Sequence, residues 1–114
     1  MNFPADQVDE LRTLYPGVQW GEEGGHTYFL IPQLPMPINC LPASMDVLFC
    51  PTPRDGYPSR LFFSEQVHVS KALNWNAHGV RILERIWCTF SWRISEAPSL
   101  RLTQLLRTHM EALR

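Results

Sequence analysis

Residues 45–63, MDVLFCPTPRDGYPSRLFF, hold two short apolar runs separated by a segment rich in proline and turn-forming residues. The first run, residues 45–50, is mostly apolar and predicts a buried strand in which Cys50 faces the core. Residues 51–58 then turn the chain, because they contain three prolines and an Asp-Gly pair. Residues 60–63, Arg-Leu-Phe-Phe, predict the next strand of an antiparallel meander.

A second pair of strands is predicted upstream of this stretch. Residues 18–20 and 26–31 are rich in strand-forming residues and flank the glycine-rich loop 21–25, a pattern typical of a hairpin. Gly24 and Gly25 lack the lysine and the following helix of a phosphate-binding loop, so we predict no nucleotide site. Four prolines lie between Pro32 and Pro42 and predict an extended loop or an edge strand, because proline has no N–H for a central ladder.

Amphipathic helices are predicted at both ends of the chain. Val8, Leu11 and Leu14 recur at three-residue steps, and the helix that they predict ends at Tyr15-Pro16-Gly17. The closing helix is predicted to begin at Pro98-Ser99. Its apolar stripe consists of Leu102, Leu105, Leu106, Met110 and Leu113.

The segment before the closing helix is less regular. Residues 67–80 have no clear period, so they form either a crossover loop or a short helix around residues 71–75. The succession of elements predicts an α+β fold, in which a small antiparallel sheet, a meander, is flanked by an N-terminal helix and a C-terminal helix.

Length and composition limit the function classes that remain. A chain of 114 residues fits one domain spanning residues 1–114, and 45% hydrophobic with 18% charged residues suits an ordinary folded domain. The formal net charge is −1 and Lys71 is the only lysine, so the chain lacks the basic footprint of a nucleic-acid-binding protein. No run approaches the ~20 apolar residues that span a bilayer, and no targeting segment opens the chain. We therefore predict a cytoplasmic protein with neither nucleic-acid nor membrane partners.

Cysteine and histidine spacing argues against a metal or disulfide framework. The three cysteines, Cys40, Cys50 and Cys88, include no C-x-x-C pair and favour a reducing compartment. His26, His68 and His109 are too dispersed to propose a metal centre, and no carboxylate joins them at ligand spacing. We predict neither a metal nor a cofactor.

Cys88 lies in Ile86-Trp87-Cys88, ten positions after His78 and thirty-one after Tyr57 of the turn Asp55-Gly56-Tyr57-Pro58. A free cysteine beside a tryptophan is usually a core residue. Here Trp92 and the proline-initiated helix follow it, and this order favours a functional role. Trp87 and Trp92 are interpreted as core residues that flank the strand carrying Cys88.

These segments in this order resemble the ubiquitin-conjugating enzyme superfamily, and specifically a bacterial branch of small, stand-alone conjugating-enzyme-like proteins. The resemblance covers nearly the whole chain. It implies that Cys88 accepts a ubiquitin-like protein as a thioester from an activating enzyme and passes it to an amine of a protein target. It also implies a role in antiviral defence, and a docking face for the activating enzyme that includes Phe3, Leu11 and the outer side of the first helix.

The motif around Cys88 is incomplete. In the eukaryotic enzymes a His-Pro-Asn motif begins ten positions before the cysteine, so His78 corresponds to its histidine and would order the site. The next two residues are Gly79 and Val80, and the motif asparagine is missing. Asn74 or Asn76 would replace it only if their loop folds back, and Arg81 or Arg85 would lower the pKa of Cys88 only if they turn toward it.

Two alternatives to the enzyme remain open. The first is a catalytically inactive adaptor of the same fold that binds a ubiquitin-like protein or an activating enzyme, and the missing asparagine favours it. The second is a small α+β interaction domain unrelated to ubiquitin.

Overall fold

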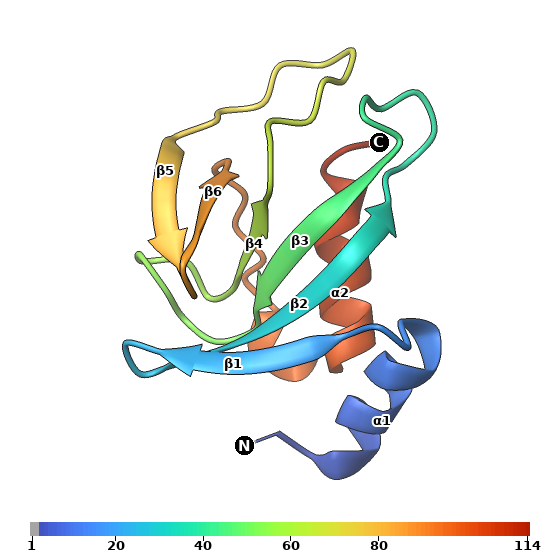
Figure 1. The fold of residues 1–114 in the computed structure, drawn as a ribbon, viewed down its shortest axis with the longest axis vertical. Coiled ribbons are helices and arrows are strands. Elements are labelled where there is room, and N and C mark those ends of the chain that lie inside the picture. Colours follow the sequence, from blue (N-terminus) through green and yellow to red (C-terminus); the bar gives the residue numbers. More distant parts are fainter. Residues whose placement is uncertain (1–2) are drawn as a thin grey trace.

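The computed structural model describes residues 3–114, which form one curled antiparallel sheet and two helices (Figure 1). The helices are α1 (Ala5–Leu14) and α2 (Leu102–Glu111), and a short 3-10 helix, η1 (Ala97–Ser99), precedes α2. The strands are β1 (Gln19–Glu23), β2 (His26–Pro35), β3 (Ser44–Cys50), β4 (Arg60–Phe63), β5 (Ala77–Ile82) and β6 (Arg85–Thr89). None of the described helices is long and apolar enough to span a bilayer.

The sheet has the strand order β1-β2-β3-β4-β6-β5, and every neighbouring pair is antiparallel. The first four strands form the predicted meander. The last two form a hairpin whose second strand, β6, lies beside β4. The predicted class, α+β with an antiparallel sheet and helices at the two ends, is confirmed, and the sheet is wider than predicted.

One face of the sheet packs against both helices; in Figure 1, α2 lies behind β2 and β3, and α1 lies below β1. Val47 and Phe49 of β3 and Phe63 of β4 join this larger core, because alternate side chains of a strand point to the same face. Leu11 of α1 and Leu106 of α2 reach the same cluster and are fully or nearly fully buried.

The opposite face is also buried, because the sheet curls over itself. Leu48 of β3 and Phe62 of β4 pack against Ile82 and Trp87 of the β5–β6 hairpin. At the hairpin tip, Leu83 approaches Gly21 of β1 so closely that a Cβ atom on Gly21 would lie 3.1 Å from a Leu83 methyl carbon. Both faces of the central strands are therefore shielded from water.

The strands predicted from residues 45–63 are confirmed, and so is the first hairpin. Its turn consists of Gly24 and Gly25, which both have positive φ angles, as the favoured two-residue hairpin turn requires. The edge-strand alternative for the proline-rich segment is correct for its first part. β1 pairs with β2 only as far as Leu30, so Pro32 and Pro35 lie where that side of β2 has no partner.

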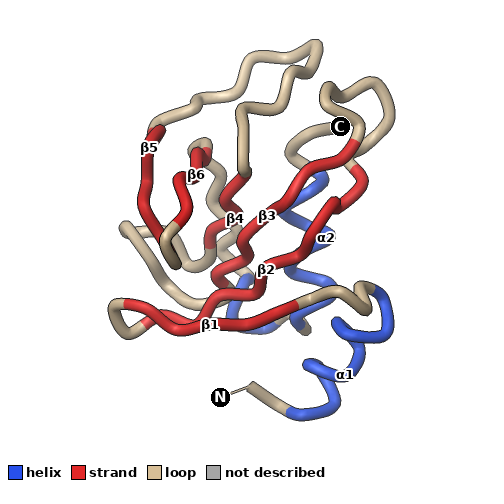
Figure 2. Tube along the Cα trace, in the orientation of Figure 1, coloured by secondary structure: helices blue, strands red, loops and turns tan. Residues whose placement is uncertain are grey.

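Of the two alternatives for residues 67–80, the loop is correct up to Asn76 and the short helix around residues 71–75 is wrong (Figure 2). β5 then begins at Ala77. The β5–β6 hairpin carries no sequence signal, since its turn places Leu83 and Glu84, rather than Asn and Gly, at positive φ. The predicted start of the closing helix at Pro98-Ser99 is wrong. α2 begins at Leu102, because Pro98 and Ser99 belong to η1 and Leu100 is extended.

Two isoleucines of the same hairpin test the second core. Ile82 is 0% exposed and Ile86 is 56% exposed. We expect Ile82→Ala to lower the free energy of unfolding by about 2–5 kcal/mol, because it removes packed methyl groups and leaves a cavity. Ile86→Ala should change it by no more than about 0.5 kcal/mol. Urea unfolding of the two variants measures the difference, and equal effects would contradict a core on this face of the sheet.

Candidate functional site

Cys88 is a core residue of β6. It pairs with Phe63 of β4 across the ladder, and its side chain is 7% exposed within the core that the helices cover. Its Sγ donates a hydrogen bond to the Phe63 carbonyl oxygen, at 3.5 Å. The thiol is thus held as a donor among apolar side chains.

Burial raises the pKa of Cys88 to about 11, and the negative charge of Glu65 adds to the effect. The arginines considered as activators do not reverse this. Arg85 forms an ion pair with Asp46 and stacks over the Trp87 ring, and Arg81 is exposed. The surroundings of Cys88 therefore favour the thiol over the thiolate.

His78 lies on β5, opposite Cys88. Ala77 pairs with Thr89 and Val80 pairs with Trp87, so His78 and Gly79 together oppose the single residue Cys88 in a β-bulge. The structure brings these two chain positions together, although the His78 side chain is exposed and the Cys88 side chain is buried.

Alkylation measures the reactivity of Cys88 directly. At pH 7.5 we expect iodoacetamide to modify Cys88 roughly 100-fold more slowly in the native protein than in urea, because its thiolate is disfavoured and its Sγ is covered. Mass spectrometry of peptides separates Cys88 from Cys40 and Cys50, which are also buried and act as internal references. Modification of native Cys88 at the unfolded rate would contradict its placement in the core.

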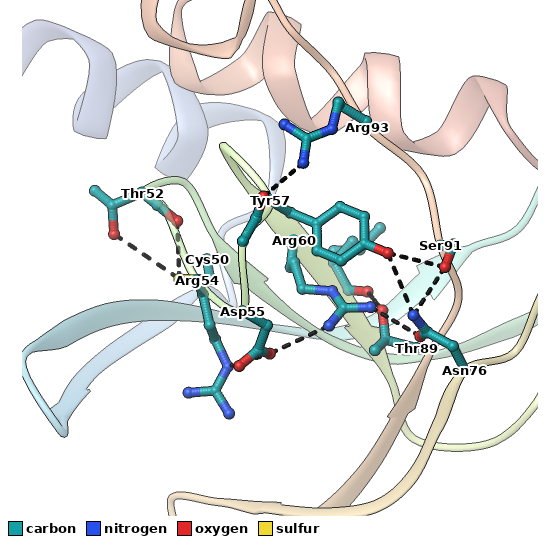
Figure 3. A network of polar contacts seen from close by, with 12 residues as sticks. Cys50, Thr52, Arg54, Asp55, Tyr57, Arg60, Asn76, Thr89, Ser91 and Arg93 are labelled. Atoms are coloured by element: carbon teal, nitrogen blue, oxygen red, sulfur yellow. Dashed lines mark hydrogen bonds and ion pairs between the residues drawn. The ribbon is translucent and has the colours of Figure 1, made fainter.

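A polar cluster, here called the Tyr57 cluster, lies at the end of the sheet and consists of Tyr57, Arg60, Asn74, Asn76 and Ser91 (Figure 3 labels all but Asn74). Asn76 Nδ2 donates to Ser91 Oγ at 2.8 Å and to Tyr57 Oη at 3.3 Å. Asn74 Nδ2 donates to Ser91 Oγ at 3.3 Å, and Tyr57 Oη lies 2.9 Å from Ser91 Oγ. Four chain segments, the β3–β4 loop, β4, the approach to β5 and the exit from β6, thus meet through hydrogen bonds.

Two arginines flank the aromatic ring of this cluster. The Arg60 guanidinium lies 4.2 Å from the centre of the Tyr57 ring and that of Arg93 lies 5.6 Å away. Arg60 also donates to Asn76 Oδ1 and pairs with Asp55, while Arg93 donates to the Gly56 carbonyl. The Ser91 hydrogen bond lowers the pKa of Tyr57, and the charges of Arg60 and Arg93 contribute further.

The sequence pattern does not predict this cluster. Asn74 and Asn76 do not replace the motif asparagine beside Cys88, because their side chains bond to Ser91 and Tyr57 instead. The loop does fold back, since the Ser91 N–H donates to the Asn74 carbonyl at 2.8 Å. The local signal at this place is the Asp-Gly-Tyr-Pro turn of residues 55–58, which predicts a turn and not a polar cluster.

A buried histidine lies behind the cluster. His109 of α2 has its Nε2 2.9 Å from Ser59 Oγ, and that hydroxyl donates to the Cys50 carbonyl. Burial, together with the positive charge of Arg60, lowers the pKa of His109 to about 3. The imidazole is therefore neutral in the folded protein.

His109 should make the fold sensitive to mild acid. Since its pKa is lowered on folding, the unfolded chain takes up the proton first, and the free energy of unfolding decreases as pH falls below about 6.5. Between pH 6 and pH 5 we expect a loss of about 1 kcal/mol attributable to this residue. Urea unfolding at both pH values measures it. His109→Gln should reduce the loss and His78→Gln, on the surface, should not; equal slopes in both variants would contradict the assignment.

The side chains of Trp92 and Leu11 lie elsewhere than predicted. Trp87 is buried as predicted, but Trp92 is 40% exposed and is not a core residue, because it lies in the irregular segment after β6. Leu11, proposed for a docking face, is 0% exposed and packs in the core. Phe3 is partly buried against the Phe29 ring.

Comparison with known proteins adds no relative, since no protein-family model, no curated protein and no solved structure matches the chain. Within the described residues no group of three or more histidine, cysteine and acidic side chains could hold a metal ion. The groups that could take part in binding or catalysis are therefore the buried thiol of Cys88 in β6 and the hydrogen-bond donors of the Tyr57 cluster, beside the guanidinium groups of Arg60 and Arg93.

Proposed function

We propose that the protein is a binding adaptor with the ubiquitin-conjugating-enzyme fold, which engages a ubiquitin-like protein or its activating enzyme without accepting an acyl group on Cys88. The observation that carries this proposal is the burial of Cys88. Cys88 is 7% exposed, its Sγ donates a hydrogen bond to the Phe63 carbonyl oxygen, and burial raises the pKa of its thiol.

The order of the elements supports the fold part of the proposal. An N-terminal helix, a four-stranded meander, an Asp-Gly-Tyr-Pro turn between β3 and β4, and a closing helix follow one another as the resemblance implies. The β5–β6 hairpin occupies the place where that layout has an extended crossover and the cysteine. Because the hairpin contributes Ile82 and Trp87 to the second core, residues 77–89 have a structural role here.

The chemistry of thioester exchange supports the adaptor over the enzyme. The acceptor must be a thiolate that the C-terminal acyl group of a protein can reach. With a pKa of about 11, Cys88 would be a thiolate in only about one molecule in 10,000 at pH 7. Access to Sγ would also require the core around Phe63 to open.

The conjugating enzyme itself is the second candidate, and the position of His78 opposite Cys88 favours it. In that reaction the Cys88 thiolate attacks the thioester carbonyl held by the activating enzyme, whose own thiolate leaves. An amine of the target then attacks the new thioester and releases Cys88. Bacterial antiviral defence is the proposed setting for either function.

One assay separates the two candidates. The protein is mixed with a ubiquitin-like protein and an activating enzyme of a bacterial conjugation system, with and without ATP, and both complex formation and covalent adducts are measured. We expect non-covalent binding that Cys88→Ala retains, and no adduct that a thiol reductant cleaves. Cys40→Ala is the matched control, since Cys40 is a second buried thiol of the same core.

The other outcomes are equally informative. A reductant-sensitive adduct that requires ATP and is absent from Cys88→Ser would overturn the adaptor and establish the transferase. Such an adduct persisting in Cys88→Ser would exclude Cys88 as the acceptor. Absence of any binding would leave the fold without its proposed partners and contradict both candidates.

A further inference from the structure

The Tyr57 cluster has a hydrogen-bond pattern that can be assigned atom by atom. Arg60 Nη2 lies 2.9 Å from Asn76 Oδ1, and a guanidinium can only donate. The carbonyl oxygen of the Asn76 amide therefore faces Arg60, and its NH₂ group faces Ser91 and Tyr57. This fixes the direction of both bonds that Asn76 makes to Ser91 and Tyr57, and the Asn74 amide likewise turns its Nδ2 toward Ser91 Oγ.

The assignment leaves the Tyr57 hydroxyl hydrogen without an acceptor. Ser91 Oγ accepts from the amides of Asn76 and Asn74, which fills its two lone pairs, so its own hydrogen must go to Tyr57 Oη. Tyr57 Oη then accepts from both Ser91 and Asn76. Within the cluster, the phenol O–H is left as a free donor.

Charge around this donor is positive. The Arg60 and Arg93 guanidinium groups lie 4.2 Å and 5.6 Å from the centre of the Tyr57 ring, and Asp55, which pairs with Arg60, contributes one carboxylate. That surplus of one positive charge contrasts with the net charge of −1 of the whole chain. Arg93 is exposed and makes no ion pair with any carboxylate in the described part of the chain.

We propose that the Tyr57 cluster and Arg93 form a binding site for a carboxylate of a protein or peptide partner. The Tyr57 O–H, the second amide hydrogen of Asn74 and the Arg93 guanidinium are all donors, and a carboxylate is an acceptor-only group that an arginine binds through two parallel hydrogen bonds. Trp92, which is exposed and precedes Arg93 in the chain, would provide an aromatic surface for the adjoining part of the peptide.

The site is preorganised before any ligand arrives. The Ser91 N–H holds the Asn74 carbonyl, and the Arg60 side chain is nearly buried between Asp55, Asn76 and the Tyr57 ring. Binding therefore requires little ordering of these groups, which favours affinity. A lysine-poor chain of net charge −1 lacks the wider basic surface that a nucleic-acid backbone requires, so a carboxylate fits better than a polynucleotide phosphate.

Small ligands test the site without any ubiquitin-like protein, so the result is independent of the proposed adaptor function. N-acetylglycine and N-acetylglycinamide are titrated into the isotope-labelled full chain, and the side-chain amide signals of Asn74 and Asn76 and the backbone amide of Ser91 are followed by NMR. We expect saturable shifts with the carboxylate, at millimolar concentration, and none with the amide. An N-acetylated Ala-Glu-Ala amide distinguishes a side-chain carboxylate from a C-terminal one as the source.

Variants assign the binding to this cluster. Tyr57→Phe keeps the ring and removes the free donor, and Arg93→Gln removes the exposed cation; we expect each to weaken carboxylate binding about tenfold. Tyr15→Phe and Arg107→Gln are the matched controls and should bind as the unmodified chain does. Backbone spectra confirm that each variant is folded.

Several outcomes would overturn the proposal. These are the absence of saturable shifts, equal shifts with N-acetylglycinamide, and wild-type affinity in both Tyr57→Phe and Arg93→Gln. Tighter binding of inorganic phosphate than of both carboxylate ligands would overturn the carboxylate specificity and assign the site to a phosphate group.

Discussion

Burial of the central strands on both faces is the constraint on which the structure depends. In β3 and β4, Val47, Phe49 and Phe63 point toward the helices, while Leu48 and Phe62 point the other way. A flat sheet with helices on one face would expose the second set to water, at a cost of roughly 25 cal/mol per Å² of apolar surface. The curl of the sheet and the β5–β6 hairpin remove that exposure, since Ile82 and Trp87 cover Leu48 and Phe62.

The burial of Cys88 follows from the way the β5–β6 hairpin covers this second face of the sheet. To place Trp87 over the second core, β6 must run beside β4, and the alternation of a strand then turns the next side chain, Cys88, into the first core. The same geometry that completes the fold thus encloses the thiol, raises its pKa and leaves His78 on the surface of the neighbouring strand. A nucleophile would need the opposite environment, an accessible and electropositive one. The adaptor hypothesis rests on this conflict between packing and reactivity.

The Tyr57 cluster arises at the open end of the curled sheet. There the β3–β4 loop, the segment entering β5 and the segment leaving β6 converge, and their polar side chains form hydrogen bonds with one another. Arg60 links this surface to the interior, because it contacts the Tyr57 ring on one side and its charge helps to keep His109 neutral. Stability and the candidate binding surface therefore share residues. Figure 3 shows how Tyr57, Asn76 and Ser91 meet beside the Arg60 guanidinium.

The sequence by itself determined the elements whose signal is local. The apolar runs of β3 and β4, the Gly24-Gly25 turn and the spacing of Val8 and Leu11 each depend on neighbouring residues only, and the antiparallel meander with two terminal helices follows from them. The β5–β6 hairpin could not be predicted, because a Leu-Glu turn at positive φ and a bulge at His78 have no local signature. Only the tertiary structure decided the burial of Cys88 and Leu11, the exposure of Trp92 and the meeting of Tyr57 with Asn76 and Ser91. Those properties depend on which distant segments pack together, and the pattern along a chain does not record such contacts.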